Sequence, residues 1–524
     1  METRPVLIAG EWRQANSDDS FAAFNPSTGE RLAESYPVSN WKDVDEALTA
    51  AAAVADELRW MPGERIAEFL NDYALRLETN QSSICAAAHE ETGLPVQPRL
   101  ADAELPRTVG QLRQAAEAAR SESWRRPVLD TKNQLRSCHV GIGPVAVFGP
   151  NNFPLAFGSV SGGDFAAAIA AGNPVIAKAH SLHPATTRLL AELAHESVVA
   201  ADLPAATVQL LYRLDHADGM RLVSDSRIGT TGYTGGRSAG LKLKAAADQA
   251  GKPIFLELSS VNPVVLLPGA MTTKSEQMVN EFVTSCLMGA GQFCTNPGLL
   301  LVVDGDETRA WISEVAQRFQ TAPSGVLLGE SVQNQLQQSL QALVSAGARV
   351  VTESPQFDAA GYGHANTLLQ TSGSVFLADP PSLQAEVFGN TSLVVVAENS
   401  GELLQIIGHL EGNLTGTVYA ADDGSDDSLA CEVQARLAPK VGRLLNDQMP
   451  TGVAVSPAMN HGGPFPATGH PGFTAVGVPA SLERFSQLLA YDHVRQEWLP
   501  GCLRDVLQNP LTWRQIDGEW RCGS

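Results

Sequence analysis

The sequence predicts an α/β protein built on two open, mostly parallel sheets. The chain has 524 residues, which is too long for one compact core, so two or three domains are expected. From Gly143 onward, short apolar runs alternate with alanine-rich stretches of helical character. Buried parallel strands are continuous apolar runs and helices connect them, so this alternation indicates βαβ units with helices on both faces of each sheet.

The part of the chain before these units is predicted to be a short strand followed by helices. An apolar run at residues 6–10 predicts the strand, and Asn-Pro-Ser-Thr-Gly at 25–29 predicts a turn. Between Trp41 and about Arg120 the chain is rich in Ala, Leu and Glu with helical periodicity, which predicts several helices. Thr-Gly-Leu-Pro at 92–95 is expected to interrupt them.

Two series of strands follow, with a boundary near residue 255. The first series is predicted at residues 145–148, 174–177, 208–212 and 227–231, with a helix at 165–171. The second series is predicted at residues 253–256, 262–267, 298–302, 392–396 and 416–419.

The composition excludes several classes of partner. A formal charge of −21 and a pI of about 4.9 argue against binding to nucleic acid or to an anionic membrane. No signal pattern begins the chain and no apolar run approaches membrane-spanning length. The seven cysteines show neither CxxC pairs nor zinc-like spacing with histidines, so no disulfide framework and no metal site are expected. A reducing cytoplasm is the expected location.

The segment Gly-Gln-Phe-Cys-Thr-Asn-Pro-Gly at residues 291–298 is the most informative part of the sequence. Its glycines and proline favour a loop that carries the thiol of Cys294 into a cleft. A thiolate there could attack a carbonyl group, and the backbone N–H of Cys294 could stabilise the resulting oxyanion. The alternative for this segment alone is a buried structural cysteine.

Two further polar side chains follow predicted strands. Asn152 comes after the strand at 145–148, where its amide could enter the ligand crevice and complete an oxyanion hole. A turn-forming asparagine is the alternative. Glu257 follows an apolar strand directly, which suits a general base, whereas an edge-strand glutamate facing water is the alternative.

A third group of residues suits a nucleotide. Gly235 and Gly240 open an alanine-rich helix, whose free amides and dipole could receive a pyrophosphate, although the spacing is not that of GxGxxG. Lys178 closes a strand, where it could either cap the strand or meet a ribose. Glu386 and Phe388 face the same side of an extended segment and would suit a ribose diol and a nicotinamide ring.

In their order along the chain these motifs resemble the aldehyde dehydrogenase superfamily. Asn-Phe-Pro, a strand-terminal Lys, GxxxxG, Glu-Leu, Gly-Gln-x-Cys and Glu-x-Phe-Gly occur in that sequence and cover nearly the whole chain. The resemblance implies that Cys294 is the nucleophile, Glu257 the base and Asn152 the oxyanion donor. It implies oxidation of an aldehyde to an acid with NAD(P), through a thiohemiacetal and a thioester on the cysteine.

The resemblance also implies the fold and the cofactor contacts. We expect an aldehyde dehydrogenase-like fold whose subunits form a homodimer or homotetramer. Its parts would be an NAD(P)-binding domain (1–120 and 141–255), a catalytic domain (256–473) and a small oligomerisation element (121–140 and 474–524). Lys178 would hold the adenosine ribose, Gly235 and Gly240 the pyrophosphate, and Glu386 and Phe388 the nicotinamide half.

A finer resemblance is to the α-ketoglutarate semialdehyde (2,5-dioxovalerate) dehydrogenases. It rests on residues 107–113, 149–157, 162–164, 178–180, 291–298 and 461–466. Such a substrate carries a carboxylate, and Arg107 is the candidate clamp because a guanidinium binds a carboxylate bidentately. The alternative is a structural arginine paired with Glu104. The remaining residues expected to line the tunnel are Phe153, Val160, Phe293 and His461.

One departure from the family bears on the cofactor. Ser181 stands where most NAD-specific members have a glutamate, so a 2′-phosphate would not be repelled, and Arg213 could add a positive charge. We therefore expect NADP to be preferred and NAD to be accepted.

Two alternatives remain open for the function. One is an NADP-dependent fatty or general aliphatic aldehyde dehydrogenase, in which Arg107 would be structural. The other is a cofactor-independent cysteine hydrolase, which needs a histidine near Cys294 and leaves the cofactor-like motifs unexplained.

Overall fold

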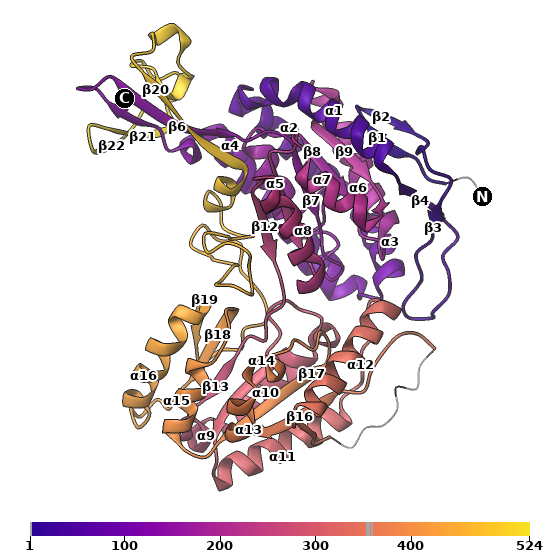
Figure 1. The fold of residues 1–524 in the computed structure, drawn as a ribbon, viewed down its shortest axis with the longest axis vertical. Helices are drawn as coiled ribbons and strands as arrows, with labels where there is room; N and C mark the ends of the chain where they lie inside the picture. Colours follow the sequence, from indigo (N-terminus) through magenta and orange to yellow (C-terminus); the bar gives the residue numbers. More distant parts are fainter. Residues whose placement is uncertain (1–2, 353–356, 358–359, 524) are drawn as a thin grey trace.

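The computed structural model describes residues 3–352, 357 and 360–523. Figure 1 shows two α/β bodies, one built from the first half of the chain and one from residues that follow β12, with a small sheet projecting from the first body. In the described part of the chain, no helix combines the length and the apolar character needed to cross a membrane. The predicted α/β class with mostly parallel sheets is confirmed.

The first sheet has seven strands in the order β12-β11-β7-β8-β9-β1-β2. The strands are β1 (Val6–Ile8), β2 (Glu11–Arg13), β7 (Val145–Phe148), β8 (Val175–Lys178), β9 (Val208–Leu211), β11 (Thr230–Thr234) and β12 (Ile254–Glu257). The five strands from β12 to β9 are parallel, and the β1–β2 hairpin adds antiparallel pairs at one edge. Polar residues that follow β7, β8 and β12 are therefore carried to the same edge of the sheet.

The helices of the first body have local sequence signals at their ends. Asn40 caps the first helix in a capping box with Asp43, and Gly93, at φ +67°, ends the third. The helical elements here are α1 (Trp41–Arg59), α2 (Gly63–Thr79), α3 (Gln81–Thr92), the π-helical segment η1 (Val96–Glu104), α4 (Leu105–Ser121), α5 (Gly163–Ala170), α6 (Pro184–Ala200), η3 (Ala205–Thr207), α7 (His216–Ser224) and α8 (Arg237–Gln249). A separate three-stranded sheet pairs β10 (Arg213–Leu214), β4 (Tyr36–Ser39) and β3 (Ser20–Phe21).

The second sheet also has seven strands, in the order β15-β16-β17-β14-β13-β18-β19, and only β15 is antiparallel to its neighbour. The strands are β13 (Val264–Leu266), β14 (Leu299–Val303), β15 (Arg349–Val350), β16 (Thr367–Ser372), β17 (Thr391–Ala397), β18 (Asn413–Tyr419) and β19 (Val441–Asn446). The helices are α9 (Pro268–Thr273), α10 (Ser275–Leu287), η4 (Met288–Gly291), α11 (Asp306–Thr321), α12 (Glu330–Ser345), α13 (Gly373–Ala378), α14 (Pro380–Leu383), α15 (Ser400–Gly408), α16 (Asp427–Leu437) and η5 (Ala438–Lys440). Buried aliphatic side chains cover both faces of this sheet.

The third sheet joins two segments that are far apart in the sequence. Its order is β20-β6-β5-β21-β22, and β6 (Leu135–Gly141) pairs along its whole length with β20 (Ser486–Asp492). The other strands are β5 (Val128–Asp130), β21 (Trp513–Ile516) and β22 (Glu519–Cys522), and short 3₁₀ turns lie at η2 (Ser123–Arg125), η6 (Ala480–Phe485), η7 (Gln496–Trp498) and η8 (Gly501–Leu503).

Several element boundaries differ from the sequence prediction, and two of them bear on the site. The strand predicted at 227–231 is shifted to Thr230–Thr234, because Arg227 is engaged in ion pairs with Asp225 and Asp45 before the strand begins. The domain boundary expected at residue 255 falls inside β12. Glu257 pairs with Thr234 of β11, so the first sheet extends through Glu257.

Candidate active site

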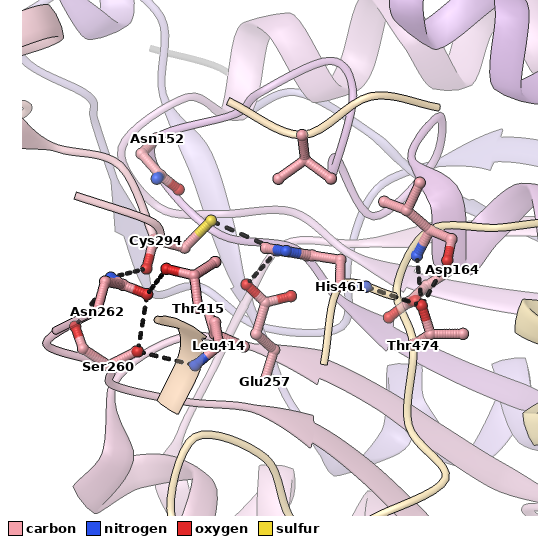
Figure 2. Close-up of polar contacts among 12 residues, drawn as sticks. Asn152, Asp164, Glu257, Ser260, Asn262, Cys294, Leu414, Thr415, His461 and Thr474 are labelled. Carbon is pink, nitrogen blue, oxygen red and sulfur yellow. Dashed lines mark hydrogen bonds and ion pairs between the residues drawn. The ribbon is translucent and has the colours of Figure 1, made fainter. Parts of the chain in front are cut away.

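Asn152, Glu257 and Cys294 lie around one cavity between the two sheets (Figure 2). Asn152 follows β7 and Glu257 ends β12, so both come from the carboxyl ends of parallel strands in the first sheet. Cys294 belongs to the second body and precedes β14. The three residues that the sequence singled out separately are thus brought together by the packing of the two bodies.

The loop before Cys294 has a backbone that requires small residues. Gly289, Ala290 and Gly291 all have positive φ, between +55° and +70°. A side chain at Gly291 would place its Cβ 2.1 Å from the carbonyl oxygen of Gly389, so only glycine fits there. After this turn the carbonyl of Cys294 accepts a hydrogen bond from Asn262 Nδ2 at 2.9 Å, which fixes the loop from the opposite side.

The side chain of Asn152 is buried against the cysteine loop. Its Nδ2 donates to the carbonyl oxygen of Gln292 at 2.9 Å, and its side chain and backbone together are only 6% exposed. An amide nitrogen carries two N–H groups, so one bond to Gln292 leaves a second donor. Asn152 therefore has the position expected of an oxyanion donor beside Cys294.

His461 was expected to line the substrate tunnel, but it lies between the thiol and the carboxylate and is not among the residues that line the tunnel. Its Nε2 is 3.5 Å from Cys294 Sγ and 2.9 Å from Glu257 Oε1. Figure 2 marks both contacts with dashed lines. A single ring nitrogen faces both groups, so it can donate to the carboxylate or accept from the thiol but not both at once. The second carboxylate oxygen of Glu257, Oε2, is buried and has no hydrogen-bond partner among the described residues.

The environment of Cys294 keeps its thiol protonated at rest. Burial raises the pKa of Cys294 well above its ordinary value, and the charge of Glu257 raises it further, whereas Arg107 acts in the opposite direction. Because the thiolate is the nucleophile, this cysteine needs a proton acceptor when it reacts. The adjacent imidazole and carboxylate of His461 and Glu257 are placed to provide one.

A tunnel of about 380 Å³ leads to Cys294 from the side of α4. Its lining includes Arg107, Phe153 and Phe293, as the sequence predicted, and Phe153 meets Phe293 edge-on at 5.4 Å between ring centres. Val160 does not line the tunnel, which corrects the prediction. It is fully buried in the core of the first body, where its carbonyl accepts a hydrogen bond from Tyr73 Oη.

Arg107 is held at the tunnel wall without a carboxylate partner. Its Nε donates to Gln111 Oε1 at 3.1 Å and its Nη1 to the carbonyl of Val453 at 2.5 Å. Its Nη2 is buried and has no hydrogen-bond partner among the residues that the structure describes. The alternative that Arg107 pairs with Glu104 is wrong, because Glu104 binds Arg99 instead.

A larger cleft of about 770 Å³ meets the same cysteine from the other side. Gly235, Glu386 and Phe388 line it, together with residues 236–239 at the N-terminus of α8. Gly236 faces open space, and the free amides at a helix N-terminus suit a phosphate group. Gly240 is buried behind them, where an added Cβ would lie 2.5 Å from Leu258, so this glycine brings the helix close to the sheet.

The comparisons with known proteins agree with this geometry. The sequence profile of the Aldehyde dehydrogenase family matches residues 12–463. The chain belongs to the aldehyde dehydrogenase family.

Two curated relatives align over most of this aldehyde dehydrogenase. It is 37% identical to alpha-ketoglutaric semialdehyde dehydrogenase 2 of Azospirillum brasilense over 98% of each chain. It is 36% identical to alpha-ketoglutaric semialdehyde dehydrogenase of Acinetobacter baylyi, over 90% of this chain and 89% of the relative. The crystal structure of lactaldehyde dehydrogenase from Escherichia coli has the same fold, with a TM-score of 0.80 and 21% identity, covering 93% of this chain and 98% of that one.

As an aldehyde dehydrogenase, the protein uses NAD(P), and its cleft fits that group chemically. The α8 amides can receive the pyrophosphate, and the half-buried Glu386 lines the cleft that Cys294 also lines. Burial raises the pKa of Glu386 to about 7, although a hydrogen bond from Ser259 and one from the Ser260 N–H oppose the rise. A ribose diol would supply Glu386 with donors.

Lys178, Ser181 and Arg213, which are expected to bind the adenosine end of the cofactor, are not among the residues that line this cleft. Lys178 ends β8, Ser181 is half-buried just beyond it, and Arg213 is exposed in β10. Burial and, to a smaller extent, the charge of Arg213 together lower the pKa of Lys178 to about 8. The two cations are therefore close enough to act on one another.

Sequence reasoning missed Arg99. Its Nη2 donates to the backbone carbonyl of Asn152 at 3.0 Å, and its guanidinium lies over the ring of Phe153 at 4.2 Å. It also forms an ion pair at 2.5 Å with Glu104, which accepts hydrogen bonds from the N–H groups of Leu155 and Ala156. No motif marks Arg99, because its contacts depend on the path of η1 over the 152–156 loop.

Proposed function

We propose that this aldehyde dehydrogenase oxidises α-ketoglutarate semialdehyde to α-ketoglutarate, with NADP preferred and NAD accepted. The observation that carries the proposal is the unpartnered Nη2 of Arg107 in the tunnel to Cys294. The names of the two curated relatives support it independently.

The argument from Arg107 is electrostatic. A buried guanidinium N–H without a partner costs free energy of about 1–3 kcal/mol. Burial lowers the pKa of Arg107, whereas the carboxylates of Glu104 and Glu257, and the thiol of Cys294 when it is ionised, act in the opposite direction. A carboxylate on the substrate would satisfy the free N–H and offset the cost of burying the charge. An aliphatic aldehyde would leave this donor unpaired.

The chemistry assigned to the chain begins with Cys294. Its thiol adds to the aldehyde carbon and its proton passes to the pair formed by His461 and Glu257. The oxyanion accepts hydrogen bonds from Asn152 Nδ2 and from the backbone N–H of Cys294. When bound, the nicotinamide of NAD(P) supplies the acceptor for the hydride that leaves this thiohemiacetal.

The second half of the reaction releases the acid. Loss of the hydride leaves a thioester on Cys294. Glu257, through its unpartnered Oε2, takes a proton from a water molecule that attacks the thioester carbonyl. The carboxylic acid departs and the thiol is restored.

The preference for NADP is inferred from charge. In the described part of the chain, neither Lys178 nor Arg213 has a carboxylate within 4 Å. Ser181 presents a hydroxyl, whereas a glutamate at this position would repel a phosphate. Burial is the main reason that the Lys178 pKa is lowered to about 8, and the nearby charge of Arg213 contributes to it. A 2′-phosphate would supply these cations with an anion. The residues proposed for the rest of the cofactor are Gly235, Gly240, Glu386 and Phe388.

We further propose a homodimer or homotetramer in the cytoplasm, assembled through the third sheet. Its strand β20 exposes Leu488 and Leu489, and the nearby tail exposes Trp498, Val506 and Trp513. Apolar side chains gathered on an edge sheet are typical of an association surface.

The test measures initial rates with α-ketoglutarate semialdehyde, hexanal and propanal, each with NADP and with NAD. The wild type is compared with Arg107→Ala and with Arg113→Ala, a matched change on the outer side of α4, where Arg113 pairs with Glu78. The proposal expects the highest kcat/KM for the semialdehyde and a selective loss of at least tenfold, about 1.4 kcal/mol, in Arg107→Ala only.

The two alternatives predict different results. If hexanal has the highest kcat/KM and Arg107→Ala changes all three substrates alike, the protein is a general aliphatic aldehyde dehydrogenase. The hydrolase alternative requires a histidine near Cys294, and His461 meets that requirement at 3.5 Å. Family membership and the cleft at α8 favour cofactor-dependent oxidation. Product formation that needs no NAD(P) would favour the hydrolase.

A further inference from the structure

Cys294, His461 and Glu257 present one sulfur, one nitrogen and one oxygen to a common point. Sγ lies 3.5 Å from Nε2, and Nε2 lies 2.9 Å from Oε1. One ligand atom from each residue lies within 4.8 Å of the other two. Figure 2 shows the three side chains converging from separate segments.

These separations are close to those around a tetrahedral zinc ion. Zinc binds thiolate sulfur at about 2.3 Å and imidazole nitrogen or carboxylate oxygen at about 2.0–2.2 Å. At tetrahedral angles these bonds place a sulfur and a nitrogen about 3.5 Å apart, and a nitrogen and an oxygen about 3.4 Å apart. The sulfur–nitrogen separation already has this value. The nitrogen–oxygen separation would reach it if the Glu257 carboxylate moved away from His461 by about 0.5 Å.

A second observation also points to a ligand. Glu257 Oε2 is buried and has no hydrogen-bond partner in the described part of the chain, so the carboxylate is not fully satisfied by His461. The site is held in place from outside, because the N–H of His461 donates to Thr474 Oγ1 at 3.0 Å and Asn262 Nδ2 holds the carbonyl of Cys294. Preorganised ligands lose little conformational entropy on binding.

We propose that these three side chains form a Zn²⁺ site that holds the enzyme in a reversibly inhibited state. Binding forms a bond between zinc and Sγ and breaks the S–H bond of Cys294, and the proton goes to the buffer. The charges of the thiolate and of the Glu257 carboxylate then balance that of the ion. The fourth position opens toward the cleft that Cys294 and Glu257 line, where water can occupy it.

The consequence is a block of the nucleophile. A sulfur bound to zinc cannot add to an aldehyde, and Glu257 cannot activate water while it binds the metal. The donor set favours zinc over magnesium or calcium, which prefer oxygen ligands. The inference depends on this geometry alone and not on which aldehyde the enzyme oxidises.

The experiment titrates the full-length protein, free of cofactor, with Co²⁺ as a spectroscopic substitute for Zn²⁺. We expect a thiolate-to-cobalt charge-transfer band that saturates at one equivalent and disappears when Zn²⁺ displaces the cobalt. Zn²⁺ should also inhibit aldehyde oxidation, and a chelator should restore it. Mg²⁺ should neither displace the cobalt nor inhibit aldehyde oxidation.

Variants assign the ligands. Cys294→Ser should abolish the band, and His461→Gln and Glu257→Gln should each weaken Zn²⁺ binding at least tenfold, measured by calorimetry on protein with an unchanged melting temperature. The control is Cys431→Ser with Cys522→Ser, which removes the exposed thiols and should change nothing.

Three results would each overturn the proposal. The first is the absence of the band at one equivalent of cobalt. The second is a band that persists in Cys294→Ser. The third is Zn²⁺ affinity that stays within twofold of wild type in both His461→Gln and Glu257→Gln, which would indicate capture by the thiol alone. Because the binding assay contains neither aldehyde nor NAD(P), a failure of the proposed substrate would leave its result unaffected.

Discussion

The side chains of His461 and Glu257 share a hydrogen bond of 2.9 Å, although 204 residues separate them in the sequence. Both are 2% exposed, so this pair is buried beside the thiol that it serves. A glutamate that accepts a hydrogen bond from an imidazole can take part in thiol activation as well as in hydrolysis of the thioester.

Replacing His461 with Gln should lower kcat by about 10²-fold, because the thiol loses its nearest proton acceptor. KM for the aldehyde should change little, since the side chain faces the nucleophile. Steady-state kinetics would measure both parameters. The control is His470→Gln, which alters an exposed histidine of the same loop region. Equal kcat values for the two variants would contradict the role given to His461.

Replacing Asn152 with Ala should lower kcat by about 10²–10³-fold, the usual cost of one oxyanion donor. The expected reason is loss of the N–H beside Cys294 rather than loss of packing. Asn152→Asp tests this, because it keeps the shape but offers only acceptors. A single-turnover measurement of NADPH formation would follow the step directly. An Asp variant with near wild-type rates would show that Asn152 is not a donor to the substrate.

Arg99 is expected to act as a positioning residue for Asn152. Arg99→Met removes the bond to the Asn152 carbonyl and leaves Glu104 buried without its ion-pair partner, so unfolding free energy should fall by about 3–5 kcal/mol. The double variant Arg99→Met with Glu104→Gln should recover part of that stability.

The kinetic readout separates positioning from stability. In the stabilised double variant kcat should remain low for every aldehyde, with KM nearly unchanged, because the Asn152 loop has lost its anchor. Arg99→Lys should recover kcat in part by restoring one donor. If the double variant recovers wild-type kcat together with its stability, Arg99 contributes to folding only.

The residue at position 181 should govern the choice between the cofactors. Ser181→Glu places a carboxylate where a 2′-phosphate is expected, so kcat/KM for NADP should fall at least tenfold, about 1.4 kcal/mol, with NAD affected far less. Ser181→Gln is the control, because it has a similar size without the charge. Equal losses for both cofactors in Ser181→Glu would place the 2′-phosphate elsewhere.

The pH dependence of cofactor binding should follow Lys178. Its pKa in the folded protein is about 8, below the ordinary value of 10.5, so the ammonium is charged at pH 7 and loses its charge as the pH rises through 8. The attraction for a 2′-phosphate is present below that pH and lost above it. The Kd for NADP should therefore rise by about tenfold between pH 7 and pH 9, equivalent to about 1.4 kcal/mol.

Fluorescence titration at several pH values would measure this effect, with NAD as the comparison because it lacks the phosphate. Lys178→Met should bind NADP weakly at every pH and remove most of the dependence. A parallel pH dependence for NADP and NAD in the wild type would contradict the assignment of Lys178 to the phosphate.

Local patterns in the sequence were enough to predict the fold class, the family and several of the strands. Val145–Phe148 was predicted to the residue, because a buried parallel strand must be a continuous apolar run. Thr-Gly-Leu-Pro at 92–95 was predicted to interrupt the helices, and in the structure Gly93, at φ +67°, ends α3. The cysteine motif and the Asn-Phe-Pro and Glu-Leu motifs are local, so they could be recognised and ordered along the chain without any knowledge of packing.

The contacts between side chains that are distant in the sequence depend on how the two bodies pack together. His461 reaches Glu257 because the segment after β19 returns between the two sheets, and nothing in either motif encodes that path. Arg99 takes the carboxylate of Glu104, so that one Arg107 N–H in the tunnel has no partner among the described residues. Val160 is buried by packing that a local pattern does not specify. Contacts between residues distant in sequence depend on the relative placement of whole elements, which local propensity and periodicity do not fix.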